Sequence, residues 1–129
     1  MSSSKCDKGK QNPIPYVPFD ITVDIQLPSY NNLQGVGGWS YVIGGSKGII
    51  VYRRGIDEFV AFDRHSPVDP DGTCFLPLFT DNDNFLVLKD TCNNATFSLY
   101  DGSPISNSPF GLRQYAVQFN GSNIVRIYN

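Results

Sequence analysis

Glycine and proline interrupt this sequence so often that long helices cannot form in it. The 129 residues include twelve glycines and nine prolines, and both residue types weaken or break a helix interior. No window carries apolar residues at the i, i+3, i+4, i+7 spacing of a helix over three turns. The many aromatic residues, nine Phe, seven Tyr and one Trp, are typical of strand-and-turn proteins. We therefore expect an all-β fold with no helix longer than about two turns.

Short segments with strand character supply the elements of this fold. Residues 21–27 alternate apolar and polar side chains, as in a strand with one buried face. Residues 49–52 are uniformly apolar, which predicts burial on both faces, and residues 58–62 follow at hairpin spacing. Further strands are expected at 85–89, 96–100, 115–119 and 124–128, and the last two should form a terminal hairpin across the Asn- and Gly-containing loop 120–123.

The length and charge of the chain limit its organisation and its partners. We expect residues 1–18, which are mostly polar and rich in proline, to form a flexible tether, and residues 19–129 to form one β domain. Ten basic and twelve acidic side chains give a net charge of −2, which argues against nucleic acid as a partner. The sequence has no run of about 20 apolar residues and opens without the apolar core of a signal peptide. Any membrane attachment would then use something other than a helix.

Residues that carry chemistry are few. The single histidine, His65, excludes mechanisms or metal sites that need two histidines from one chain, and no Gly-x-Ser-x-Gly elbow is present. We interpret His65 as a surface or turn residue, and we expect no enzyme active site. The glycine-rich segments 35–38 and 44–48 match no phosphate-binding fingerprint, and 81–84 lacks the Gly and Glu of a calcium loop. We interpret all three as turns, whereas the aperiodic segment 66–84 is a candidate functional loop.

The three cysteines fall into two groups. Cys74 and Cys92 lie in the body of the domain, whereas Cys6 lies in the tether. In an oxidising compartment a Cys74–Cys92 disulfide would contribute on the order of 3 kcal/mol in the loop-entropy model. Two buried free thiols are the alternative.

From Gly48 to the C-terminus, the order of features resembles the Rieske-type [2Fe–2S] ferredoxin domain, especially that of bacterial surface lipoproteins. The resemblance covers about two thirds of the chain and rests on the order and spacing of several short motifs. These are Gly48-Ile49-Ile50-Val51-Tyr52-Arg53, Glu58-Phe59-Val60-Ala61-Phe62-Asp63-Arg64, the second loop entering Phe97, Tyr100-Asp101-Gly102-Ser103-Pro104, the residues Pro109, Leu112, Arg113, Gln114 and Tyr115, and Val125-Arg126-Ile127-Tyr128-Asn129. It implies a Rieske-like small antiparallel β-sandwich or barrel with two loops at the cluster end.

The family's cluster ligands are missing from this sequence. In the family, Cys-x-His in one loop and Cys-x-x-His in the other hold the two irons through two thiolates and two imidazoles. The resemblance places Ser66 and Val68 at the first pair of ligand positions, and Asp90 and Asn93 at the second pair. We therefore expect no cofactor.

The resemblance also assigns roles to the cysteines. Many family members carry an extra cysteine in each loop, and these two cysteines form a disulfide beneath the cluster. Cys92 matches one of these positions and Cys74 lies in the loop that supplies the other, so the resemblance implies a Cys74–Cys92 disulfide. Cys6, followed by a polar tether, is similar to the lipidated first residue of a mature bacterial lipoprotein, although no apolar lipobox precedes it. We expect lipidation of Cys6, an unmodified tail cysteine being the alternative.

Three functional hypotheses follow. The first is a cluster-free, non-catalytic binding or accessory module outside the cytoplasm, in the periplasm or as an outer-membrane lipoprotein, whose partner is a protein or envelope component. Its contact with a membrane would be the lipid anchor at Cys6. The second is an electron carrier that holds iron through atypical ligands such as Asp90, Cys92 and His65, which the scarcity of thiolates disfavours. The third is an unrelated structural β-sandwich.

Overall fold

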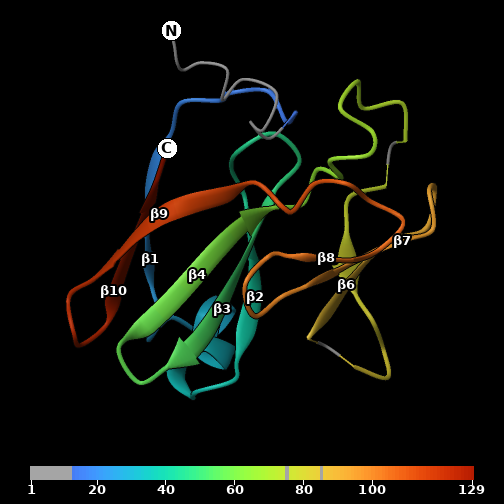
Figure 1. The fold of residues 1–129 in the computed structure, drawn as a ribbon. Helices are drawn as coiled ribbons and strands as arrows, with labels where there is room; N and C mark the ends of the chain where they lie inside the picture. The colour runs from blue at the N-terminus through green and yellow to red at the C-terminus, as the bar shows by residue number, and fades with distance from the viewer. Residues whose placement is uncertain (1–12, 75, 85) are drawn as a thin grey trace, which may run out of the picture.

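Ten β-strands form two antiparallel sheets in the computed structural model, which describes residues 13–74, 76–84 and 86–129 (Figure 1). The larger sheet has six strands in the order β1-β10-β9-β4-β3-β2, and the smaller has four in the order β5-β6-β7-β8. The expected all-β sandwich or barrel architecture is confirmed. The strands are β1 (Asp20–Asp24), β2 (Trp39–Val42), β3 (Ile49–Gly55), β4 (Glu58–Asp63), β5 (Phe79–Thr80), β6 (Val87–Asp90), β7 (Ala95–Ser98), β8 (Pro104–Ser106), β9 (Gln114–Phe119) and β10 (Ile124–Tyr128).

The hairpin of β3 and β4 lies at the centre of the molecule. Residues 49–52 are buried on both faces, as their uniformly apolar sequence predicted, and residues 59–63 of β4 are buried as well. Because side chains alternate along a strand, the hairpin contributes to two cores at once. Val51 and Ala61 belong to the core that also contains Val125 of β10. Ile50 and Phe62 belong to the second core, which includes Leu88 and Phe97 of the small sheet. The hairpin therefore joins the two sheets through apolar packing.

The two ends of the described chain meet at one edge of the large sheet. β9 and β10 form the expected terminal hairpin, and β1 pairs with β10 from Asp20↔Tyr128 to Asp24↔Ile124. The strand predicted for residues 21–27 ends earlier than expected, at Asp24. The carboxylate of Asp24 accepts a hydrogen bond from the amide of Gln26 (2.9 Å), which turns the chain toward the 3₁₀ segment η2 (Pro28–Gln34). No helix in the described part of the chain is long and apolar enough to cross a membrane.

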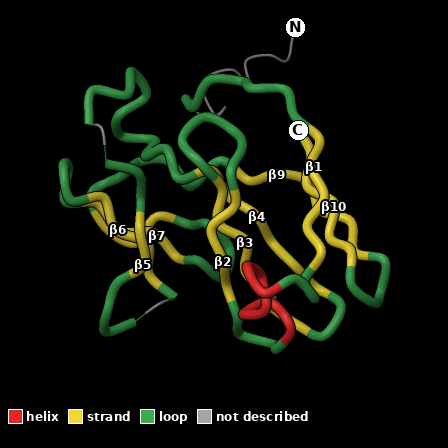
Figure 2. Tube along the Cα trace, turned by 180° about the vertical axis from the view of Figure 1, so that it is seen from behind, coloured by secondary structure: helices red, strands yellow, loops and turns green. Residues whose placement is uncertain are grey.

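Three strands, β2, β5 and β8, were not predicted from the sequence. β2 follows a glycine-rich stretch and begins directly after Gly38, where a Cβ atom would lie 1.7 Å from the carbonyl oxygen of Asn32 in η2. Glycine is needed here for the close approach of two backbones rather than to open a loop. β5 and β8 are two and three residues long, too short to show a period. Figure 2 shows η2 beside β2, with the small sheet on the other side of that strand.

The small sheet brings two loops to one end. β5 pairs with β6 through Phe79↔Lys89, and β6 pairs with β7 through Asp90↔Ala95. The loop that enters β5 and the loop that joins β6 to β7 therefore lie side by side. We call the described residues of these two segments, within 64–78 and 91–94, the loop end. The expected strands 85–89 and 96–100 are present but begin and end elsewhere, as β6 and β7.

Candidate functional site

A disulfide between Cys74 and Cys92 connects the two segments of the loop end, with Cα atoms 6.2 Å apart. Cys74 is half-buried and Cys92 is exposed. The structure thus contains the bridge that the family resemblance implies, and the alternative of two free buried thiols does not apply to it. Cys6, the proposed lipidation site, lies outside the described residues.

The residues that the resemblance places at the four ligand positions serve the local structure of the loops. The hydroxyl oxygen of Ser66 accepts a long hydrogen bond from the amide of Val68 (3.4 Å), and the Val68 side chain packs against the second core. The buried carboxylate of Asp90 accepts hydrogen bonds from the amides of Cys92 (3.0 Å) and Asn93 (3.1 Å). It also accepts one from the side-chain amide of Asn93 (3.0 Å). Both loops are therefore closed by their own polar groups.

These residues do not fit a [2Fe–2S] cluster. One iron needs two thiolates, but the sulfur atoms of Cys74 and Cys92 are bonded to each other. Among the described residues, the one group of three potential metal ligands consists of Cys74, Asp90 and Cys92, whose ligand atoms lie within 4.8 Å of one another. This group contains no imidazole and two of its three members are in the disulfide.

His65 is buried, at 3% exposure, rather than lying at the surface. Its Nε2 atom is 2.7 Å from the carbonyl oxygen of Asp69, and its Nδ1 atom is 2.8 Å from the hydroxyl oxygen of Ser46. A carbonyl oxygen only accepts, so Nε2 carries the proton, and in the neutral ring Nδ1 accepts from Ser46. The ring connects the β2–β3 loop, residues 43–48, to the loop end, and both of its nitrogens already have partners.

Asp63, at the end of β4, holds the β2–β3 loop in place through hydrogen bonds to its backbone. Its fully buried carboxylate accepts hydrogen bonds from the amides of Ser46 (2.6 Å), Lys47 (3.1 Å) and His65 (2.8 Å), and from the hydroxyl of Tyr115 (2.5 Å). Burial, followed by the bond to Asp63, raises the pKa of the Tyr115 phenol. Gly45 has φ +64°, and a Cβ atom there would lie 2.4 Å from an oxygen of Asp63. The loop backbone can therefore approach this carboxylate closely enough to hydrogen-bond with it only with glycine at position 45.

A second carboxylate, that of Asp69, orders the chain next to the disulfide. It accepts hydrogen bonds from the amide (3.0 Å) and hydroxyl (2.7 Å) of Thr73 and from the amide of Cys74 (2.8 Å). These bonds, first of all the one from the Thr73 hydroxyl, hold the pKa of Asp69 below its ordinary value. The ammonium group of Lys47 donates a hydrogen bond to the Cys74 carbonyl oxygen, which joins the β2–β3 loop to the same segment.

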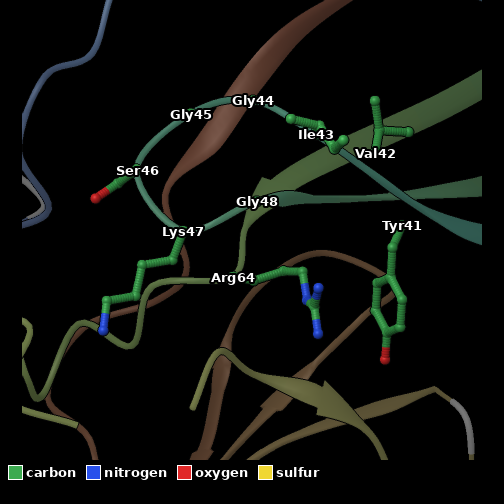
Figure 3. A pocket seen from close by; sticks show the side chains of 9 residues that line it. All are labelled: Tyr41, Val42, Ile43, Gly44, Gly45, Ser46, Lys47, Gly48 and Arg64. Atoms are coloured by element: carbon green, nitrogen blue, oxygen red, sulfur yellow. The ribbon is translucent and has the colours of Figure 1, made fainter. Parts of the chain in front are cut away.

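A pocket of about 390 Å³ lies between the β2–β3 loop, the end of β2 and Arg64 (Figure 3). The Arg64 guanidinium lies 3.7 Å from the centre of the Tyr41 ring, and its Nε donates to the carbonyl oxygen of Leu78 (2.8 Å). Burial lowers the pKa of Arg64 from its ordinary value. The pocket is lined by Tyr41, Val42, Ile43, Gly44, Gly45, Ser46, Lys47, Gly48 and Arg64.

Comparison with known proteins gives no family for the chain: no family model and no curated protein matches it. His65, Cys74, Cys92 and the four positions that the resemblance assigns to ligands were identifiable in the sequence, but the roles of Asp63 and Asp69 were not predicted. One signal for Asp63 was available, because a carboxylate that directly follows the buried run 59–62 needs several donors. The donors come from a loop 16 and 17 residues away and from a strand 52 residues away, which the sequence alone does not bring together.

Proposed function

We propose that this chain is a cluster-free, Rieske-like domain that acts as a non-catalytic binding or accessory module at the bacterial cell envelope. The observation that carries the proposal is the loop end itself. Its two segments are joined by the Cys74–Cys92 disulfide, and the carboxylates of Asp69 and Asp90 bond to the backbone of their own loops. A preformed surface of this kind binds a partner with little loss of loop entropy.

The arrangement of the loops supports the Rieske-like part of the proposal. The resemblance implies two loops at one end of a sheet with a disulfide between them, and the small sheet carries such a pair at the β5 and β6–β7 end. An unrelated β-sandwich would have no reason to reproduce both the pairing of the loops and the bridge. The strand order of both sheets is the feature to compare with Rieske domains of known structure.

The location of the protein is inferred from the same bridge. Disulfides form and persist in oxidising compartments such as the bacterial periplasm and the cell surface. A lipid on Cys6 would tether the domain to a membrane, and the envelope would then supply the partner, a protein or another envelope component. Mass spectrometry of the protein purified from its native host tests the anchor, because an acyl group on Cys6 adds a defined mass.

The partner surface is tested by photo-crosslinking in intact native cells. We place a photoreactive amino acid at Thr91, which is exposed beside the disulfide, and combine it with Leu76→Asp, which introduces a charge at a side chain that is 60% exposed in the loop end. The matched control is Ile56→Asp in the distant β3–β4 turn, where the side chain is 73% exposed. We expect an adduct with an envelope component that Leu76→Asp abolishes and Ile56→Asp preserves. An adduct that is unaffected by Leu76→Asp, or one with a cytoplasmic protein, would refute the proposal.

The competing redox function has its own test. The group Cys74, Asp90 and Cys92 is the one observation in its favour, and it would require reduction of the disulfide before iron bound. Iron and sulfide assays with an absorbance spectrum, on protein made anaerobically, decide the matter. We expect colourless protein without stoichiometric iron, and two irons per chain with a visible cluster spectrum would establish the electron carrier instead.

A further inference from the structure

The pocket shown in Figure 3 lies next to the loop end and shares one described residue with it, Arg64. One wall is formed by Tyr41, Val42 and Ile43, of which Val42 has its side chain buried in the first core, and another by the glycine-rich β2–β3 loop. Arg64 enters from the end of β4 and lies beside Tyr41. The three elements therefore bring a cation, an aromatic ring and exposed backbone to one cavity, and the disulfide takes no part in it.

Arg64 is held in place without an ion pair to any described residue. Its Nε atom is bonded to the Leu78 carbonyl oxygen, and the Tyr41 ring covers one face of the guanidinium. Arg54 and Arg126 each form an ion pair, but within residues 13–74, 76–84 and 86–129 no carboxylate lies within ion-pair distance of Arg64. The Tyr41 side chain and the carboxylate of Asp63 also interact with the guanidinium without forming an ion pair. Its Nη1 and Nη2 groups have the spacing of paired donors that a carboxylate recognises.

The backbone next to Arg64 is free of side chains and fixed in position. Gly44 and Gly45 line the cavity with backbone alone, and their amides make no hydrogen bond to any described residue. The following amides, of Ser46 and Lys47, are held by the carboxylate of Asp63. A ligand would therefore meet a wall of backbone that is already held in place.

We propose that this pocket binds a small organic carboxylate, with the Arg64 guanidinium as its anion-binding group. A single carboxylate charge matches the single cation that faces the cavity, since Lys47 is turned away and donates to the Cys74 carbonyl oxygen (Figure 3). The apolar side chains of Tyr41 and Ile43 then contact the organic part of the ligand. The proposal does not depend on the partner surface at the loop end.

Chemical-shift titration of the ¹⁵N-labelled protein tests the site, with benzoate as the probe. We expect saturable shifts of the Gly44 and Gly45 amides, no such shifts with the neutral analogue benzamide, and weaker binding of inorganic phosphate. Arg64→Gln should weaken benzoate binding by about tenfold, because it removes two charge-assisted hydrogen bonds. Arg126→Gln, on the distant strand β10, is the control and should leave the affinity unchanged. Absence of saturable shifts, or equal binding of benzamide or phosphate, would overturn the proposal.

Two variants of opposite charge at the rim of the pocket keep the test valid if Arg64→Gln fails to fold. The Ile43 side chain is 94% exposed, so both Ile43→Asp and Ile43→Lys should leave the fold intact. We expect Ile43→Asp to weaken benzoate binding and Ile43→Lys to strengthen it, and identical affinities would contradict an anion site.

A tetrapeptide ending in a free phenylalanine carboxylate, compared with its C-terminal amide and with benzoate, tells whether the carboxylate of a peptide or that of a free acid is preferred.

Discussion

The large sheet and the loop end are stabilised by different kinds of interaction. In the large sheet, residues 49–52 of β3 and 59–63 of β4 are buried, and their apolar side chains are divided between two cores. In the loop end, a disulfide and the carboxylates of Asp69 and Asp90 order segments that have little strand structure. Apolar burial is additive and tolerant of shape-conserving changes, whereas each polar or covalent contact depends on particular residues.

This difference explains how the two regions can change independently. The apolar framework fixes where the loops begin and end, and the loops then need their own stabilising groups whether or not they hold a metal. In this chain Asp90 and Cys92 provide such groups at and next to positions that the family resemblance assigns to ligands. The following predictions test the division between the regions, from the largest expected effect to the smallest.

Phe62→Ala should have the largest effect, because it removes a fully buried ring from the core that joins the two sheets. The packing around it is tight, since a Cβ atom on Gly102 would lie 2.6 Å from the Phe62 ring. We expect the free energy of unfolding to fall by about 3–5 kcal/mol, measured by chemical denaturation. Ile56→Ala, at an exposed turn of the same hairpin, should change it by no more than about 0.5 kcal/mol. A loss below about 1 kcal/mol for Phe62→Ala would contradict the central role of this core.

Removal of the disulfide should loosen the loop end and leave the large sheet folded. Cys74 and Cys92 are 18 residues apart, so replacing both with serine should lower the free energy of unfolding by about 3 kcal/mol in the loop-entropy model. Hydrogen exchange should show faster exchange in residues 64–78 and 91–94, while β3 and β4 stay protected. Alkylation and mass spectrometry of the non-reduced protein provide the control. Two alkylated thiols there, or equal loss of protection in both regions, would be inconsistent with this account.

The sequence predicted the large sheet better than the loop end, for the same physical reason. The buried hairpin and the terminal hairpin were visible because burial imposes a local pattern, and residues 49–52 and 124–128 carry it. β5 and β8 are too short for a period, and they exist because the neighbouring strands of the small sheet offer hydrogen bonds. The burial of His65 and the partners of Asp63 depend on contacts between distant segments, which no local pattern encodes. The pairing of Cys74 with Cys92 came from a resemblance in feature order rather than from spacing.

Tyr115→Phe tests the hydrogen bonds of Asp63, which connect the large sheet to the β2–β3 loop and to His65 of the loop end. The Tyr115 hydroxyl on β9 donates to Asp63, which in turn holds the β2–β3 loop. Loss of this bond should lower the free energy of unfolding by about 1–3 kcal/mol at neutral pH. The pKa of Tyr115 is raised in the folded state, so the wild-type stabilisation is complete below the unfolded value of about 10 and is lost as the pH rises above it. Denaturation at several alkaline pH values should show this loss in the wild type and in the exposed control Tyr16→Phe, but not in Tyr115→Phe.

Acid should affect the loop end through Asp69, with the smallest effect of the four. The pKa of Asp69 is lowered in the folded state, so its contribution is present above the unfolded value of about 3.9 and is lost as the pH falls below it. We expect the amide resonances of Thr73 and Cys74 to shift together in this acidic range, because both donate to that carboxylate. Asp69→Asn keeps one accepting oxygen but cannot titrate, so the step should vanish. Asp101 makes the same kind of bonds to Ser103 between β7 and β8, and its pKa is also lowered. Asp101→Asn should therefore leave the step at Thr73 and Cys74 unchanged, and a step that persists in Asp69→Asn would show that another group controls this end of the molecule.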